Sequence, residues 1–303
     1  MLLFKLSVGL VKFSRPGLRL CLVFLLLFGH GQNSSAQKLK SSLLWKIEGK
    51  NFQKPSYLFG TIHIICPNDF EMFQPVKEAV ESSELMFLEL DMDDSTLMAS
   101  MQIKMLNPGM RNFSQDLDVE TKKVLNEFFI AHFGVGLDRL GIMKPFSLMT
   151  MMNVKYIECA APLSYENALI EQAKLNAIEV MGLEDLDFQL GLFDQIPQEE
   201  MIKWLVEGTD IEENKKMFSE MISTYKTKDV ENIYKFSMEN SPEFKAYEDM
   251  LLIGRNKDWI PKIISNASKQ PTFFAVGAGH LGGKSGIISL LKKEGYKLTP
   301  IKL

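Results

Sequence analysis

Two segments near opposite ends of the chain repeat one pattern, and this repeat constrains the fold more than any other sequence feature. Residues 55–63 read Pro-Ser-Tyr-Leu-Phe-Gly-Thr-Ile-His, and residues 271–280 read Pro-Thr-Phe-Phe-Ala-Val-Gly-Ala-Gly-His. In each segment a short apolar run, typical of a buried strand, leads into Gly-x-x-His. We therefore expect two equivalent strands, each followed by a turn that carries a histidine.

The residues around these segments predict a strand–helix–strand unit at each end of the chain. At the N-terminal end, residues 43–48 and 56–60 predict a hairpin, followed by a helix over about 73–83 and an apolar strand over 85–90. At the C-terminal end, we expect a strand over 272–276, a helix over about 284–294 and a strand over 296–301. These two βαβ-like units are expected to build one sheet.

Between the two units, residues 95–268 change to the apolar period of 3.6 that amphipathic helices show, with one strand at about 177–182. Because no Pro-, Gly- or Ser-rich linker divides residues 40–303, we expect residues 37–303 to form a single domain. The predicted fold class is α/β (α+β), with a mixed β-sheet core and a large helical insertion. Helices are predicted over 119–132, 163–176, 185–195, 198–208, 211–225, 229–238, 243–254 and 256–268.

Residues 1–36 have the pattern of a secretory signal peptide. Four basic residues and no acidic residue accompany the apolar run 20–28, and small residues follow it. This run is shorter than the roughly 20 residues that span a bilayer, so we expect cleavage after Ala36, with a site near Gly31 as the alternative. The protein is then exported, periplasmic or extracellular, and membrane-associated only where the signal stays uncleaved. In an exported chain Cys66 and Cys159 can form a disulfide, although two separate buried thiols fit the sequence equally well.

Composition and charge exclude several classes of function. The chain is 46% apolar and 24% charged, as globular proteins are, and its 18 methionines are interpreted as flexible core packing. The formal net charge of −4 becomes −8 without residues 1–36, and no basic cluster is present, so we expect no nucleic-acid partner. Residues 37–303 hold three histidines. His132 suits the end of a predicted helix, which leaves His63 and His280 for the site.

Three side chains meet at one edge of the sheet if the strands over 56–60, 85–90 and 272–276 are neighbours. His63 and His280 follow the two repeated strands, and Glu89 follows the apolar run 85–88. A carboxylate beside such a run is costly unless it is paired or coordinated. Two histidines and one carboxylate with open positions for water are the ligands of many hydrolytic metal sites. We therefore predict a divalent metal site formed by His63, Glu89 and His280, with Asp91 on the same strand face as a candidate general base.

Four sequence blocks carry a resemblance to a known family: residues 59–63 (Phe-Gly-Thr-Ile-His), 87–91 (Phe-Leu-Glu-Leu-Asp), 252–259 (Leu-Ile-Gly-Arg-Asn-Lys-Asp-Trp) and 275–281 (Ala-Val-Gly-Ala-Gly-His-Leu). They resemble the TraB/PrgY/GumN family, which includes the TIKI metalloproteases. The resemblance covers about 43–303 and implies a mixed-sheet fold related to the erythromycin esterase and ChaN-like folds.

In the TIKI branch the resemblance also implies peptide cleavage that depends on a divalent metal, with cobalt or manganese supporting activity. His63 and His280 match the family's two motif histidines, and Glu89 matches its acidic residue. Arg255 matches the family's Arg-Asn block. Glu184, which follows the predicted strand over 177–182, has a counterpart in the family and is expected to line the cleft.

Two functions stay open on these residues. The first is an exported metal-dependent hydrolase acting on a peptide or another small substrate, in which a manganese, cobalt or zinc ion activates water and Asp91 or Glu89 accepts the proton. Arg255 would stabilise the oxyanion or clamp a substrate carboxylate, although a structural ion pair explains it equally well. The second is a non-catalytic protein that uses the same residues to bind haem, metal or peptide. The sequence indicates no particular substrate, metal or oligomeric state.

Overall fold

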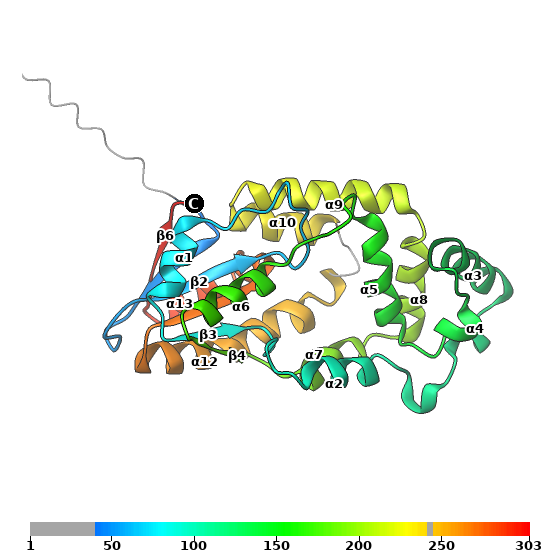
Figure 1. Ribbon diagram of the computed structural model, residues 1–303, viewed down its shortest axis with the longest axis horizontal. Helices are drawn as coiled ribbons and strands as arrows, with labels where there is room; N and C mark the ends of the chain where they lie inside the picture. The colour runs from blue at the N-terminus through cyan, green and yellow to red at the C-terminus, as the bar shows by residue number, and fades with distance from the viewer. Residues whose placement is uncertain (1–39, 241–244) are drawn as a thin grey trace, which may run out of the picture. The chain divides into compact units, whose positions relative to one another are not determined.

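The computed structural model describes residues 40–240 and 245–303. The predicted signal peptide, residues 1–36, lies outside these ranges, as do the first residues of the helix predicted over 243–254. The described residues form a mixed α/β fold with one β-sheet and a large helical part (Figure 1), which confirms the predicted fold class. None of the described helices is long and apolar enough to span a membrane.

In the described part of the chain, the sheet has six strands in the order β4-β3-β5-β2-β1-β6. The neighbours β2, β5, β3 and β4 are parallel, whereas β1 is antiparallel to both β2 and β6. The three strands that precede the predicted site residues are therefore neighbours, as the site prediction requires. The bounds are β1 Leu44–Glu48, β2 Ser56–Thr61, β3 Leu85–Leu88, β4 Glu179–Gly182, β5 Thr272–Gly277 and β6 Lys297–Ile301.

Each predicted βαβ-like unit is split by strands from elsewhere in the chain. β5 lies between β2 and β3 and pairs in parallel with both. In the C-terminal unit, β6 lies at the sheet edge against β1 and not beside β5. The reason is burial, because β5 is apolar on both faces and its first five residues are buried, which a central strand requires. The two ends of the chain therefore interleave in one sheet.

Four helices pack in pairs around this sheet, and Figure 1 shows α6 in front of the strands. Helix α1 (Gln74–Glu81) contacts α6 (Tyr165–Leu175), and α12 (Arg255–Lys269) contacts α13 (Ile287–Lys293). Their buried residues recur at i, i+3 and i+4, as in Val76, Ala79 and Val80 of α1, so each helix turns one apolar face inward. The helices predicted over 73–83, 163–176, 256–268 and 284–294 are confirmed.

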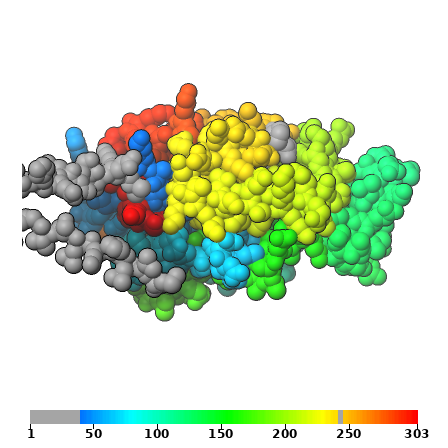
Figure 2. All heavy atoms as spheres, turned by 90° about the horizontal axis from the view of Figure 1, so that it is seen from above, coloured from blue at the N-terminus to red at the C-terminus, as the bar shows by residue number. Residues whose placement is uncertain are grey.

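The helical insertion is also confirmed. Its helices α3, α4, α5 and α8 lie at the opposite end of Figure 1 from the sheet and enclose a second core around Phe129, Leu148 and Leu205. Helices α9 and α10 contact each other and form the middle of the face seen in Figure 2 (yellow). The bounds are α2 Leu97–Lys104, α3 Val119–Phe133, α4 Leu137–Leu140, α5 Pro145–Tyr156, α7 Leu186–Phe193, α8 Gln198–Glu207, α9 Ile211–Lys226 and α10 Val230–Asn240, with a π-helix, Asp249–Gly254, leading into α12.

Helices α2, α4 and α5 lack a clear amphipathic period, and the sequence does not predict them. Helix α2 buries none of its residues, and Met98 and Ile103 on it are 60% and 72% exposed. The interpretation of the methionines as core packing holds for Met152, which is buried in α5, and is wrong for Met98.

Cys66 and Cys159 form a disulfide, which decides between the two alternatives that the sequence leaves open. Next to it, Ile65 and Leu163 form a β-bridge through two backbone hydrogen bonds of 2.8 and 3.0 Å. The segment that follows β2 is thus fixed to the segment that precedes α6.

Candidate functional site

The parallel pairing of β5 with β2 and β3 brings the three predicted metal ligands to one edge of the sheet. Thr61 pairs with Gly277 at the C-terminal ends of β2 and β5. His63, Glu89 and His280 lie just beyond the ends of β2, β3 and β5. Oε1 of Glu89 accepts a hydrogen bond from the N–H of Gly277 at 2.8 Å and lies 3.9 Å from Nε2 of His280.

Gly277 leaves a small space that all three side chains border. A Cβ atom on Gly277 would lie 3.3 Å from Oε1 of Glu89, 3.7 Å from Cδ2 of His280 and 3.8 Å from Nε2 of His63. The φ angle of Gly277 is −50°, which any residue can adopt. Glycine therefore serves here to keep space open between the three side chains.

Asn256 fixes the tautomer of His280. Nδ2 of Asn256 donates to the backbone carbonyls of His280 (3.3 Å) and Ser285 (3.0 Å), so its Oδ1 must accept the proton of Nδ1 of His280 at 2.6 Å. Nε2 then keeps its lone pair, which accepts a hydrogen bond from Nη1 of Arg255 at 3.3 Å. Burial lowers the pKa of His280 to about 3, against the opposing charge of Glu89, so the ring is neutral at physiological pH. Neutral imidazole is the form that binds metals.

His63 is held by a carboxylate instead of an amide. Oε1 of Glu166 lies 2.9 Å from Nδ1 of His63 and accepts from the hydroxyl of Thr61 at 2.6 Å, while Oε2 accepts from the hydroxyl of Ser164 at 2.7 Å. Glu166 is buried, whereas the His63 side chain is 66% exposed. Desolvation lowers the pKa of His63, but the hydrogen bond and charge of Glu166 outweigh it and raise this pKa to about 9. The ring is therefore protonated at neutral pH in the metal-free protein, and a metal ion would have to displace the proton of Nε2 to bind there.

Arg255 is enclosed so completely that all five of its N–H bonds have acceptors within the protein. Nη2 donates to Oε2 of Glu89 at 2.6 Å and to Oε1 of Glu184 at 2.5 Å, and Nε donates to Oε2 of Glu184 at 3.1 Å. Nη1 donates to the carbonyl of Leu251 at 3.2 Å and to Nε2 of His280 at 3.3 Å. This is the arrangement expected of a structural ion pair, and it leaves no N–H of Arg255 for an oxyanion.

Two further side chains complete this network. Nε2 of Gln189 donates to Oε1 of Glu184 at 3.0 Å and to Oε2 of Glu89 at 3.4 Å, and Nε1 of Trp259 donates to Oε2 of Glu184 at 3.1 Å. Burial alone would raise the pKa of Glu89, but its neighbours His280 and Arg255 outweigh burial and lower that pKa to about 2. Glu89 is therefore ionised at neutral pH.

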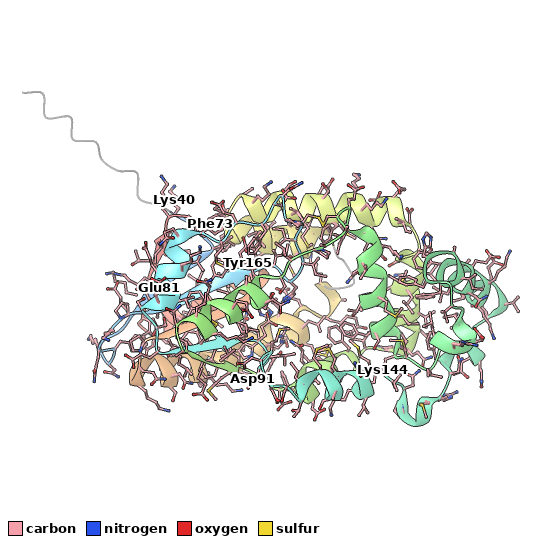
Figure 3. The ribbon with its side chains drawn as sticks, in the orientation of Figure 1. Lys40, Phe73, Glu81, Asp91, Lys144 and Tyr165 are labelled. Carbon is pink, nitrogen blue, oxygen red and sulfur yellow. A yellow bond between two sulfur atoms is a disulfide. The ribbon has the colours of Figure 1, made fainter. Side chains whose placement is uncertain are left out.

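Asp91, the predicted general base, lies outside the network. β3 ends at Leu88, so the strand alternation that was expected to align Asp91 with Glu89 does not extend to either residue. Figure 3 shows Asp91 beyond the C-terminal end of β3, and within the described ranges no hydrogen bond or ion pair joins it to Glu89 or either histidine. Burial and the side chain of Asp93 raise the pKa of Asp91 to about 6.

Sequence reasoning missed Glu166 and Gln189 and gave Asn256 no role of its own. Glu166 lies in the first turn of α6, where acidic residues are common because they suit the helix dipole. Gln189 is a polar residue on an amphipathic helix, so its sequence context carries no signal. Glu184 was expected to line the cleft, and it is instead buried as the partner of Arg255.

The donor types at this edge fit a divalent cation. Two atoms that each bind one ion at roughly 2 Å can be up to about 4 Å apart, and Nε2 of His280 and Oε1 of Glu89 meet this limit at 3.9 Å. As the side chains stand, no three His, Cys, Asp or Glu residues of the described chain form a closed metal-binding group. Nη1 of Arg255 lies 3.3 Å from Nε2 of His280, so an ion bound there would require this N–H group to move.

The class of this protein is defined by two features of the described chain. Strand β5 lies between β2 and β3 in a mixed sheet, and a Gly-x-x-His turn is present at the ends of β2 and β5. The chain belongs to the TraB/PrgY/gumN family, whose model matches residues 43–300. It is similar to "Metalloprotease TIKI2" of Danio rerio, with 22% identity over 87% of this chain and 61% of the relative. It is also similar to "Metalloprotease TIKI homolog" of Nematostella vectensis, with 24% identity over 89% of this chain and 69% of the relative.

The chain thus spans about three fifths of the first of these relatives. No solved structure matches it. The relation to the erythromycin esterase and ChaN-like folds therefore stays an expectation.

Proposed function

We propose that this protein is an exported, metal-dependent hydrolase that cleaves peptide bonds. The observation that carries the proposal is the common space beside Gly277, which is bordered by Nε2 of His63, the ring of His280 and Oε1 of Glu89. The names of the two relatives, both metalloproteases, support this reaction class. The pattern of residues 1–36 and the Cys66–Cys159 disulfide support export, because disulfides persist in oxidising compartments.

In this proposal His63, Glu89 and His280 hold one divalent ion, which is manganese, cobalt or zinc. Such an ion supplies a bound water of lowered pKa and polarises a substrate carbonyl. Asn256 orients His280, and Arg255 holds the carboxylate of Glu89 in place. Because His63 is the exposed histidine and His280 is buried, the substrate approaches from the His63 side.

Asp91 remains the proposed proton acceptor. Since no direct hydrogen bond joins it to the other site residues in the described ranges, it would act through one intervening water molecule. Arg255 has all its donors engaged within the protein, so we assign it to the support of Glu89 and not to an oxyanion.

The experiment is a peptide-library cleavage assay on protein purified after export. Bound metal is measured first, then removed with EDTA and replaced by Mn²⁺, Co²⁺ or Zn²⁺. We expect EDTA to abolish cleavage, at least one ion to restore it, and His63→Ala and His280→Ala each to lower it more than about 100-fold. His132→Ala is the matched control, because His132 is an exposed histidine on α3 that contacts Phe128.

Cleavage that survives both His63→Ala and His280→Ala would contradict the proposal. Tight Mn²⁺ or peptide binding without any cleavage, or a Soret band on haem addition, would instead favour the binding protein. Mass spectrometry of the exported protein tests cleavage after Ala36.

A further inference from the structure

We infer that Glu166 is the positioning residue of His63, and that it sets the strength of His63 as a ligand. This inference rests on the proposed function for the metal, but the contact itself is independent of any ion. Of the two site histidines, His63 alone has a carboxylate on its Nδ1, because His280 has the neutral amide of Asn256 there. A carboxylate that is hydrogen-bonded to one ring nitrogen of a histidine fixes the ring and raises the basicity of the other ring nitrogen.

Glu166 is rigid enough for this role. Both of its oxygens accept hydrogen bonds, from Thr61 and Ser164 in addition to His63, and the residue is only 6% exposed. The next residue toward the N-terminus, Tyr165, is buried and its hydroxyl donates to the carbonyl of Glu71 at 2.9 Å. The carboxylate of Glu166 therefore has one position, which the start of α6 determines.

The turn of His63 is also fixed on both sides of this contact. Thr61 precedes His63 and donates to the same oxygen of Glu166, while Ile65 and Cys66 follow it and join Leu163 and Cys159. A well-fixed ring can be aimed at the space beside Gly277, whereas its 66% exposure would otherwise let it rotate. The insertion thus contributes to the site through the segment 159–166, although none of the predicted metal ligands lies in this segment.

The test compares four forms of the full exported protein: wild type, Glu166→Ala, Glu166→Gln and the control Glu171→Gln. Glu171 is an exposed residue of the same helix, paired with Lys174. The first measurement is the downfield ¹H NMR signal of the hydrogen-bonded ring N–H of His63 in metal-free protein, assigned by its loss in His63→Ala. The second is the affinity for Mn²⁺, followed by EPR of the free ion.

We expect Glu166→Ala to lose the His63 signal and to bind Mn²⁺ about 10–100-fold more weakly. Glu166→Gln has the same shape and retains an acceptor oxygen, so it should keep the signal and recover part of the affinity. Glu171→Gln should match the wild type. The Gln variant separates positioning from misfolding. If Glu166→Ala fails to fold, the NMR signal and the Mn²⁺ affinity can still be measured in Glu166→Gln.

A ring N–H signal that is unchanged in Glu166→Ala overturns the inference, as does unchanged Mn²⁺ affinity in a variant that has lost the signal. If the wild type binds none of Mn²⁺, Co²⁺ and Zn²⁺, the proposed function fails. The NMR signal then still decides whether Glu166 positions His63, so the two failures are distinguishable.

Discussion

Nη2 of Arg255 lies 2.6 Å from Oε2 of Glu89, and this contact joins a helix of the C-terminal third of the chain to the end of β3. The same guanidinium also binds Glu184, so two largely buried carboxylates share one cation. Without Arg255, Glu89 and Glu184 would be two negative charges close together in a poorly solvated environment. The candidate site therefore depends on Arg255 for its stability as well as for its geometry.

Arg255→Ala should destabilise the protein by about 3–5 kcal/mol, because it leaves two buried carboxylates without their cation. Urea denaturation of the metal-free protein measures this. Arg111→Ala is the control, since Arg111 and Asp116 form an exposed pair that is worth at most about 1 kcal/mol. Equal effects of the two substitutions would contradict the enclosed network around Arg255.

Gly277→Ala should abolish metal binding and hydrolysis while the fold is retained. Its methyl group would lie 3.3–3.8 Å from atoms of Glu89, His280 and His63, in the space that the proposed ion or its water needs. The change in unfolding free energy should stay below about 1 kcal/mol, because the backbone angle suits alanine.

The matched control for Gly277→Ala is Gly191→Ala in α7, where a Cβ meets nothing within 4 Å. It should leave Mn²⁺ affinity unchanged and stabilise the helix by up to about 1 kcal/mol. A Gly277→Ala protein with wild-type Mn²⁺ affinity and turnover would show that the ion lies elsewhere.

Reduction of the Cys66–Cys159 disulfide should lower stability by about 2–5 kcal/mol, because the bond closes a loop between residues 93 positions apart. The measurement is urea denaturation with and without dithiothreitol. The double variant Cys66→Ser, Cys159→Ser should resemble the reduced wild type and should not respond to dithiothreitol. A wild type whose denaturation midpoint is the same under both conditions would contradict a disulfide in the exported protein.

Asp91→Asn should stabilise the metal-free protein above pH 6 and have no effect below about pH 4. Folded Asp91 has a pKa of about 6, against an ordinary value of 3.8, so between these pH values the folded state binds more protons than the unfolded state. Stability then falls as the pH rises through this window. Urea denaturation in EDTA at pH 4, 5 and 7 measures the difference between the variant and the wild type.

The same variant tests the proposed proton acceptor, because loss of a general base costs about 100-fold to 10,000-fold in turnover. We expect Asp91→Asn to be more stable at pH 7 yet nearly inactive. A stabilised variant with full turnover would remove Asp91 from the mechanism.

Most of the fold could be predicted from local sequence, because buried strands and amphipathic helices have distinct periods. The strand over 272–276 was predicted within one residue of β5, and its neighbours β2 and β3 followed from the shared pattern of apolar runs. The insertion of β5 between β2 and β3 could be stated only as a condition, since strand order depends on contacts between distant segments. Helix α2 was missed because none of its residues is buried, whereas the prediction of amphipathic helices relies on one apolar face that packs inward.

The candidate site was predictable as far as its residues follow the ends of strands. His63, Glu89 and His280 converge because parallel neighbours end at one edge of the sheet. Glu166 could not be predicted, because its role depends on how the start of α6 packs against the turn of His63. The position of Asp91 was wrong because β3 ends before the alternation reaches it.

The position of β5 at the centre of the sheet has a consequence for biosynthesis. The turn of His63 is synthesised early, and the turn of His280 follows it 217 residues later in the sequence. Any nascent or truncated chain that stops before β5 lacks the strand between β2 and β3, and with it the second histidine. Such a fragment has at most two of the three predicted ligands, so the candidate centre can form only after β5 and the turn that follows it have been synthesised.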